Sequence, residues 1–342
     1  MKTFNNLYSK IYDFQNLYLA YLKARRGKRY TTDALDYRTC LETNLITLQN
    51  ELIWKAYKTG SYRTFYVYEP KLRMVAALPF KDRVLQHALC NVIEPIYEAR
   101  FIADSYACRP GKGIHAGADR AQFFMRTVKR DGPLFCLKGD IAQYFPSVDH
   151  DVLKNLLSKH IACSDTLQLC DEIIDSAASL SGCAKGMPIG NLTSQLFANI
   201  YMHELDIFVK QVLKERFYVR YMDDFVIFAN SKPHLHDKRN QIANFLDEKL
   251  KLKMNGKTQV FPVKNRSVDF LGYKIWPTHR LLRKTSVVKM KRKLKNSTNK
   301  NQINQSVQSW LGHAKHANSF NLINRLFNNT TGAGDGRLQK GN

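Results

Sequence analysis

The chain of 342 residues is long enough to bury a large core and to form two or three subdomains. Hydrophobic residues make up 44% of it and aromatic residues 11%, which excludes an intrinsically disordered protein. Lys and Arg total 53 against 29 Asp and Glu, and the net charge of +24 predicts a polyanionic partner. Nucleic acid is favoured over membrane, because no apolar run approaches the ~18 residues of a spanning helix.

The first half of the chain begins with helices and then mixes helices with strands. Residues 1–60 read as helices, because apolar positions recur at helical spacing among basic ones. Residues 60–80 alternate like a β-hairpin with its turn near Glu69-Pro70-Lys71. Helical periodicity follows over residues 81–101, and residues 134–141 predict a short buried strand.

The second half continues the mixture and ends in a basic region. Its predicted elements are a helix over 149–161, a Gly-rich loop over 181–191, a long helix over 193–216, a strand hairpin over 220–228, a helix over 236–252 and short strands up to residue 275. Basic and helical segments follow Trp276-Pro277, and the Gly-rich tail is expected to be disordered. Because strict βαβ alternation is absent, we expect an antiparallel α+β core with helices to one side.

Seven scattered cysteines, with no C-x-x-C pair, argue against a disulfide framework or a zinc ribbon. The N-terminus lacks the apolar core of a signal peptide. Both features predict a protein of the reducing cytoplasm.

Two adjacent acids interrupt an apolar hairpin in "RYMDDFVIF" (220–228). Strands disfavour Asp, so Asp223 and Asp224 form either a solvated turn or a metal site in which a cation removes their repulsion. A third acid, Asp140, ends the strand of "LKGDIAQYFPSVDH", a position where an acid considered alone is more often a turn or helix-entry residue. If the two strands pair, Asp140 and Asp223 meet at one end of a sheet, as two-metal phosphoryl chemistry requires.

These segments resemble the ordered motifs of reverse transcriptases. "DIAQYF", "YMDD" and "FLGYKI" match in the correct order, and "YEPKLRMVAALPFKDRVLQHAL" and "DSYACRPGKGIHAG" resemble the finger motifs before them. Most reverse transcriptases carry a Gln before the loop Gly and a Ser-Pro on the next helix. This chain has Ile189-Gly190 and Ser194-Gln195 in "MPIGNLTSQ", the pattern of reverse transcriptases from diversity-generating retroelements.

The resemblance implies an α+β right-hand polymerase fold. Fingers, a palm with an antiparallel sheet and helices, and a helical thumb would follow an N-terminal extension. The expected divisions are 1–60 for the helical extension, 61–135 for the fingers, 136–276 for the palm with a finger insertion at about 150–185, 277–330 for the thumb and 331–342 for a disordered tail.

The resemblance also assigns roles at the catalytic centre. Two Mg²⁺ ions would be held by Asp140, Asp223 and the main-chain carbonyl of Ile141. Asp224 would be a further ligand, or would support the site through hydrogen bonds.

The same resemblance implies the residues that bind nucleotide and nucleic acid. Phe145 corresponds to the steric gate that excludes a 2′-OH, and the alternative is that it is a core aromatic like its neighbour Tyr144. The other expected nucleotide-binding residues are Lys71, Arg73, Tyr144, Ile189, Gly190 and Lys257. The expected nucleic-acid contacts are Arg109, Gln195, Lys289 and Arg292, the last two on thumb helices that grip phosphates.

The resulting expectation is an RNA-dependent DNA polymerase that copies a template-repeat RNA into cDNA with errors mainly opposite adenine, so that a variable gene segment is rewritten. Its partners would be that RNA, the RNA/cDNA duplex, dNTPs and a small basic accessory protein, in a bacterial or phage-infected cell and not at a membrane. The alternatives are a group II intron-like or defence-associated reverse transcriptase, or a non-catalytic RNA-binding protein on the same fold.

Overall fold

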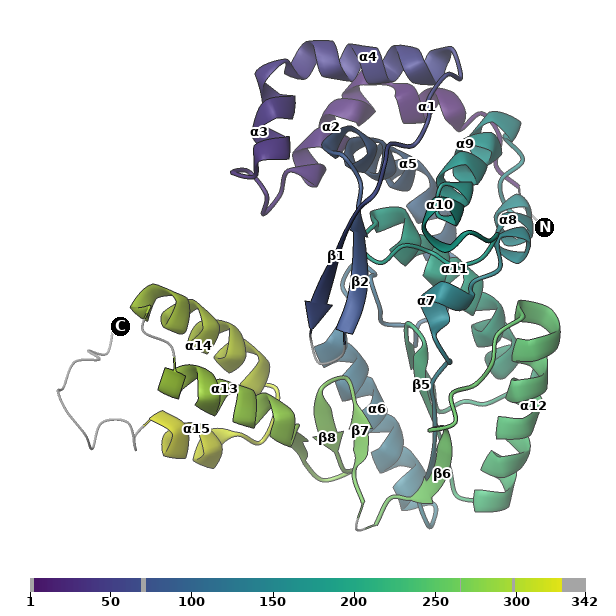
Figure 1. Ribbon diagram of the computed structural model, residues 1–342. Coiled ribbons are helices and arrows are strands. Elements are labelled where there is room, and N and C mark those ends of the chain that lie inside the picture. The colour runs from purple at the N-terminus through teal and green to yellow at the C-terminus, as the bar shows by residue number, and fades with distance from the viewer. Residues whose placement is uncertain (1–2, 69–71, 265, 297–298, 328–342) are drawn as a thin grey trace.

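The computed structural model describes residues 3–68, 72–264, 266–296 and 299–327. Four helices open the chain and lie together at one end of the molecule (Figure 1). They are α1 (Tyr8–Tyr12), α2 (Phe14–Ala24), α3 (Thr32–Thr39) and α4 (Leu41–Ile53). Leu17, Leu45, Leu48 and Leu52 are fully buried, so the predicted helical periodicity is confirmed.

The predicted hairpin is β1 (Arg63–Tyr68) and β2 (Leu72–Ala77), which pair antiparallel from Arg63↔Ala77 to Tyr68↔Leu72. Its turn lies outside the described residues. The hairpin extends from the N-terminal helices toward the middle of the molecule (Figure 1). Helix α5 (Phe80–Glu98) follows and buries one side against α2 and α11 (Leu192–Ile207).

A four-stranded antiparallel sheet, the central sheet, forms the middle of the molecule, with the strand order β4-β5-β3-β6. Its strands are β3 (Phe135–Gly139), β4 (Tyr218–Tyr221), β5 (Asp224–Ala229) and β6 (Gln259–Pro262). Helix α6 (Ile114–Arg130) packs on one face, while α11 and α12 (Lys232–Leu250) lie on the other.

The expectation of helices to one side is therefore wrong. Phe225 and Ile227 face the α11 and α12 layer, whereas Val226 and Phe228 face α6, and all four are buried. A strand that is apolar at every position must be covered on both faces.

Between β3 and β4 the chain forms a helical layer that leads into α11. It contains α7 (Tyr144–Ser147), α8 (His150–Ser158), α9 (Ser164–Asp175) and α10 (Ala178–Ser181). Asp149 begins α8 as an N-cap, since its side chain accepts from the Val152 N–H at 3.2 Å. The long helix predicted to reach residue 216 is shorter, because α11 gives way to a π-helical turn, η1 (Phe208–Val212).

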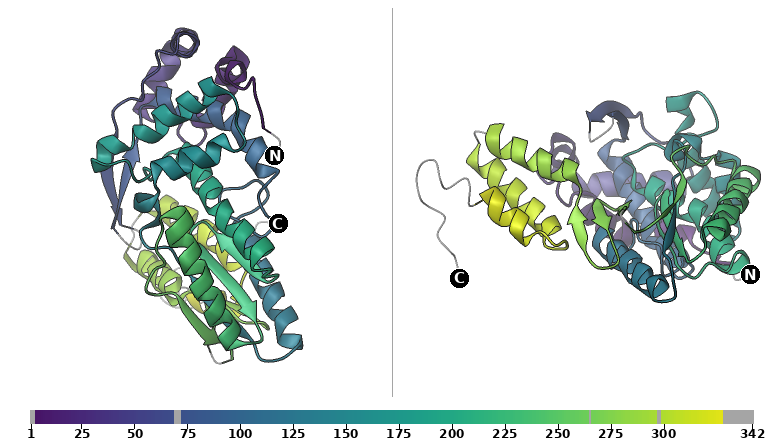
Figure 2. Two further views of the ribbon diagram at one scale, coloured as in Figure 1. Left: turned by 90° about the vertical axis from the view of Figure 1, so that its right-hand side faces the viewer. Right: turned by 90° about the horizontal axis from the view of Figure 1, so that it is seen from below.

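The C-terminal part begins with a three-stranded antiparallel sheet and continues into helices. The strands are β7 (Val268–Phe270), β8 (Tyr273–Ile275) and β9 (Arg280–Leu282), and the helices are α13 (Lys284–Asn296), α14 (Lys300–Ala314) and α15 (Phe320–Phe327). These three helices stand to one side of the rest of the described chain (Figure 2). None of the helices in the described ranges is long and apolar enough to cross a membrane. The predicted tail, 331–342, lies outside those ranges.

Candidate active site

The antiparallel sheet brings the three predicted acids to one end of β3 and β5. Gly139 pairs with Phe225, so Asp140 and Asp224, the next residue outward on each strand, stand opposite one another. Asp223 lies in the two-residue turn between β4 and β5. A Cβ at Gly139 would overlap the Phe225 ring, so glycine is needed immediately beneath Asp140.

Asn255 holds the Asp140 carboxylate in place. Its Nδ2 donates to Asp140 Oδ2 at 2.9 Å, and its backbone N–H donates to the Asp140 carbonyl at 2.7 Å. The Asp140 N–H in turn donates to Thr258 Oγ1 at 3.4 Å. Asn255 was not predicted as a site residue, although it lies only two residues before Lys257, which was predicted to bind nucleotide.

The hairpin acids carry unfavourable charge in the absence of a cation. Burial raises the pKa of Asp223, repulsion from Asp140 raises it further, and Arg73 lowers it. Burial also raises the pKa of Asp224 to about 7, opposed by Lys138, whose Nζ lies 3.8 Å from Asp224 Oδ2. No described residue offers a hydrogen bond to the buried Asp224 Oδ1. These carboxylates are thus arranged to gain from a bound cation.

A buried arginine supports the turn that carries Asp223. Met222 adopts a left-handed φ of 55°, which is uncommon for a residue with a side chain, and its carbonyl accepts from Arg220 Nη1 at 2.9 Å. Arg220 is fully buried and pairs with Asp206 of α11 through two 2.7 Å contacts. This bidentate pair ties the turn to α11 and was not predicted.

A pocket of about 540 Å³ opens beside the acids and joins residues from distant parts of the chain. Asp140, Asp223, Arg73, Phe145 and Ile189 all line it. Arg73 is exposed on β2, and Phe145 and Ile189 are half-buried. Two of the three predicted acids, Asp140 and Asp223, therefore meet the predicted cation Arg73 and the predicted gate Phe145 in one pocket, which Asp224 does not line.

The loop before α11 is anchored to the finger hairpin. The Ile189 carbonyl accepts from the Ala76 N–H of β2 at 2.9 Å. Gly190 has a φ of +125°, and a Cβ there would lie 2.9 Å from the Ala76 carbonyl oxygen. Only glycine fits this crossing, so the Ile189 side chain is held at the pocket wall.

Two predicted contact residues are occupied elsewhere. Tyr144 borders the pocket, but it is only 2% exposed and its OH donates to the Ala198 carbonyl at 2.7 Å, so its ring is held in the core. The Arg109 side chain is 5% exposed and pairs with Glu98 at 2.7 Å, so it braces a loop and does not face nucleic acid. Arg109 was predicted to contact nucleic acid because its partner Glu98, eleven residues away in the sequence, was not recognised as such.

The remaining predicted residues lie around the pocket or away from it. Lys257 is exposed in the Asn255 loop but does not line the pocket, and Gln195 is exposed on α11. Lys289 and Arg292 are exposed on α13. Lys71 lies outside the described residues.

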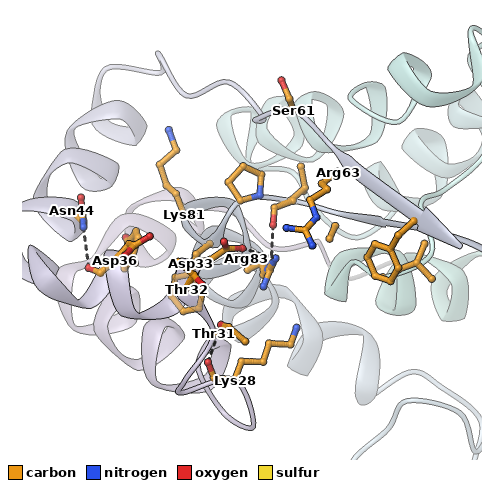
Figure 3. A pocket seen from close by; sticks show the side chains of 18 of the residues that line it. Lys28, Thr31, Thr32, Asp33, Asp36, Asn44, Ser61, Arg63, Lys81 and Arg83 are labelled. Carbon is orange, nitrogen blue, oxygen red and sulfur yellow. Dashed lines mark hydrogen bonds and ion pairs between the residues drawn. The ribbon is translucent and has the colours of Figure 1, made fainter. Parts of the chain in front are cut away.

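A larger groove of about 1350 Å³ lies on the other side of β2, against the N-terminal helices. Val75 and Ala77 face this groove, whereas Arg73 and Met74 line the pocket with the acids. Figure 3 shows Lys28, Arg63, Lys81 and Arg83 around it, with Asp33 beside Arg83. The groove is larger, but Asp140, Asp223 and Asp224 do not line it. The smaller pocket is therefore the candidate active site.

The residues of the smaller pocket suit Mg²⁺ better than a metal held by protein alone. Across the described ranges, no three His, Cys, Asp or Glu side chains form a metal-binding group. Mg²⁺ is commonly bound by one or two carboxylates together with substrate phosphates and water. Asp140 and Asp223 supply that number of carboxylates to the pocket, so the donor set fits.

The chain matches the family model "Reverse transcriptase (RNA-dependent DNA polymerase)" over residues 58–275, more than half of its length. It is 25% identical to protein YkfC of Escherichia coli (strain K12), over 72% of this chain and 73% of that protein. It is also 25% identical to the group II intron-encoded protein LtrA of Lactococcus lactis subsp. cremoris, over 75% of this chain but only 53% of LtrA.

Telomerase from Candida tropicalis, solved with a fragment of telomeric RNA, superposes with a TM-score of 0.51 at 13% identity. The superposition covers 81% of this chain and 57% of the telomerase chain. It shows similarity of fold alone, and the expected α+β right-hand polymerase fold is confirmed.

Proposed function

The chain belongs to the reverse transcriptase (RNA-dependent DNA polymerase) family, and on that premise we propose that it copies RNA into DNA at the pocket of Asp140 and Asp223. The observation that carries the proposal is the meeting of these two acids with Arg73, Phe145 and Ile189 around a single cavity. In this reading the α6, α11 and α12 sandwich is the palm, the β1–β2 hairpin belongs to the fingers, and α13–α15 form the thumb.

Each residue has a separate task in the proposed reaction. Asp140 and Asp223, with the Ile141 carbonyl and support from Asp224, would hold Mg²⁺. When bound there, two Mg²⁺ ions supply charge stabilisation for the attacking and leaving oxygens of nucleotide transfer. Arg73 lies near enough to lower the pKa of Asp223, so it can contact the triphosphate at the same centre.

Phe145 is placed to select the sugar of the incoming nucleotide. It lines the pocket wall, while Tyr144 beside it is held in the core, with the two ring centres 5.5 Å apart and the rings inclined at 65°. An aromatic face held in this way can exclude a ribose 2′-OH by contact. We therefore assign dNTPs as the substrates.

RNA is expected to bind over an extended basic surface. Lys257, Gln195, Lys289 and Arg292 are exposed, and Lys28, Arg63, Lys81 and Arg83 line the larger groove, where a single-stranded template can lie. Contacts of this kind read phosphates without reading sequence and weaken as salt rises.

The finer assignment is to a diversity-generating retroelement. Ile189-Gly190 and Ser194-Gln195 support it, because they replace the Gln and Ser-Pro of other reverse transcriptases. A template-repeat RNA would be copied with errors mainly opposite adenine, with a small basic accessory protein, in the cytoplasm of a bacterial or phage-infected cell. Two near-identical repeats in the flanking DNA, differing at adenines of one copy, are the expected genomic signature.

The similarity to LtrA favours a second candidate, a group II intron-like reverse transcriptase. Flanking DNA that lacks these repeats and encodes an intron-like RNA would support that candidate. Both predict primer extension on poly(rA)/oligo(dT) with Mg²⁺. A folded protein that binds this hybrid but extends no primer would instead be the non-catalytic RNA-binding protein.

A further inference from the structure

A second basic pocket lies at the β4 edge of the central sheet, where the segment around Ser105 bridges to Arg220, and away from the acids. We call it the sheet-edge pocket; it has a volume of about 460 Å³ and lies between α6 and the segment that joins η1 to β4. Phe217, at its wall, precedes β4, whereas Asp223 follows that strand. At about 3.3 Å per residue, Phe217 lies about 13 Å from Tyr221, the last residue of β4 before the turn that carries Asp223. Helix α6 runs along the sheet away from the β1–β2 hairpin (Figure 1).

Positive charge exceeds negative charge in this pocket. Arg120, Lys210, Lys214 and Arg216 line it together with the carboxylates of Asp104 and Glu215. Asp104 is shared, since Arg120 Nε lies 2.8 Å from one of its oxygens and Lys210 Nζ 3.0 Å from the other. Glu215 is engaged by His234 Nε2 at 2.7 Å. The acids are therefore already partnered, and Lys214 and Arg216 leave the pocket with net positive charge.

Flat apolar surfaces lie among these cations. Phe123 is 55% exposed at the pocket, so its ring is accessible to a ligand. The Arg120 guanidinium carbon lies 5.5 Å from the centre of that ring and 4.3 Å from the centre of the buried Phe124 ring. Arg216 lies over Phe217 in the same way, at 5.5 Å. Exposed aromatic and guanidinium planes among cations are what unpaired nucleobases stack on.

The segment that carries Lys214 and Arg216 is held in shape. The π-helical turn η1 precedes it, and Lys214 has a left-handed φ of 56°. Lys210 Nζ donates to the Arg216 carbonyl at 2.7 Å while it also binds Asp104, so it closes the segment over the pocket floor. A preformed surface loses less entropy on binding than a mobile one.

We propose that the sheet-edge pocket binds unpaired RNA, stacking a base on Phe123 and Arg120 while Lys214 and Arg216 contact the flanking phosphates. The choice of RNA over another polyanion rests on the proposed function. The pocket is a holding site for template RNA outside the catalytic cleft, at a distance that a few unpaired nucleotides can span.

The charge contribution is tested by the double variant Lys214→Glu/Arg216→Glu. The matched control is a second double variant, Arg239→Glu/Lys249→Glu, on α12. Binding is measured by fluorescence anisotropy on a short primer–template and on the same hybrid with an unpaired RNA extension of about 20 nucleotides. We expect the test variant to lose about tenfold in affinity for the extended RNA only. The slope of log affinity against log salt concentration should become shallower by about 1.4, because two phosphate contacts are lost and each contributes about 0.7. The control should bind both probes as the wild type does.

The stacking contribution is tested by Phe123→Ala, with Phe123→Tyr as the conservative variant. The alanine variant should lose about tenfold for the extended RNA, and the tyrosine variant should keep wild-type affinity. Photo-crosslinking of 5-bromouridine RNA should label the tryptic peptide of residues 121–126. Wild-type affinity in both Phe123→Ala and the double variant would overturn the proposal and leave an acidic protein segment as the occupant. Because binding is read directly, the result stands whether or not the protein extends primers.

Discussion

Replacing Asp224 by Asn should stabilise the metal-free protein at neutral and alkaline pH. Burial raises the pKa of the Asp224 carboxyl to about 7, so the folded state favours its protonated form. A pKa raised by folding contributes stability that is fully present below the ordinary value of 3.8 and is lost progressively as pH rises from there through about 7. Asn has nearly the same shape but carries no charge, so the variant avoids that loss.

The magnitude follows from the size of the pKa shift. From an ordinary value of 3.8 to about 7, at about 1.4 kcal/mol per unit, the upper limit is about 4 kcal/mol. The side chain is 27% exposed, and water and Lys138 can relax around the charge. We therefore expect about 1–2 kcal/mol, which corresponds to a rise in Tm of about 2–4 °C.

The assay is thermal unfolding of wild type and Asp224→Asn in EDTA, at about pH 8 and about pH 4. The exposed carboxylate of Asp237, on α12, gives the control variant Asp237→Asn, which should leave the Tm unchanged. The Asp224→Asn gain should be full at the higher pH and much smaller at the lower one, which lies close to the ordinary carboxyl pKa of 3.8. A variant that is less stable than wild type at about pH 8, or equally shifted at both pH values, would refute the electrostatic reasoning.

Three further substitutions test the pocket. Gly139→Ala should cost about 1–3 kcal/mol of unfolding free energy in chemical denaturation, because the added methyl overlaps the Phe225 ring, and Phe225→Leu in the same chain should recover part of it. Phe145→Ala should raise rNTP use relative to dNTP use in single-nucleotide incorporation assays, and an unchanged ratio would make Phe145 a core residue only. Ile189→Gln should lower misincorporation opposite template adenine more than opposite other bases in sequenced cDNA, whereas an active variant with an unchanged adenine share would contradict the assigned role.

Local patterns were sufficient to predict the elements that carry the acids. The apolar runs that flank Asp140 and Asp223 read as strands, and antiparallel pairing then places the two acids at one sheet end. Helix α6 was not predicted, although its buried residues Ala118, Ala121, Met125 and Val128 recur at helical spacing.

The supports of the site depend on contacts that no local pattern records. Asn255 lies 115 residues from Asp140, and nothing in its own segment indicates that partner. Arg220 was visible beside the acids, but its bidentate pairing with Asp206 follows from the packing of α11 on the central sheet. The partner of a charged residue was therefore harder to predict than its presence. A cation that pairs with a carboxylate of the same chain and a cation that binds a phosphate have the same sequence pattern.

Mg²⁺-dependent primer extension on poly(rA)/oligo(dT) by wild type, Asp140→Asn and Asp223→Asn tests whether these two acids form the polymerisation centre. Each substitution removes a carboxylate charge with little change in volume, so the variants should keep the wild-type fold by circular dichroism and bind the hybrid with similar affinity. The wild type should extend the primer and both variants should lose incorporation by about a thousandfold or more. Near-wild-type extension by either folded variant would contradict the assignment of Asp140 and Asp223 as the polymerisation centre.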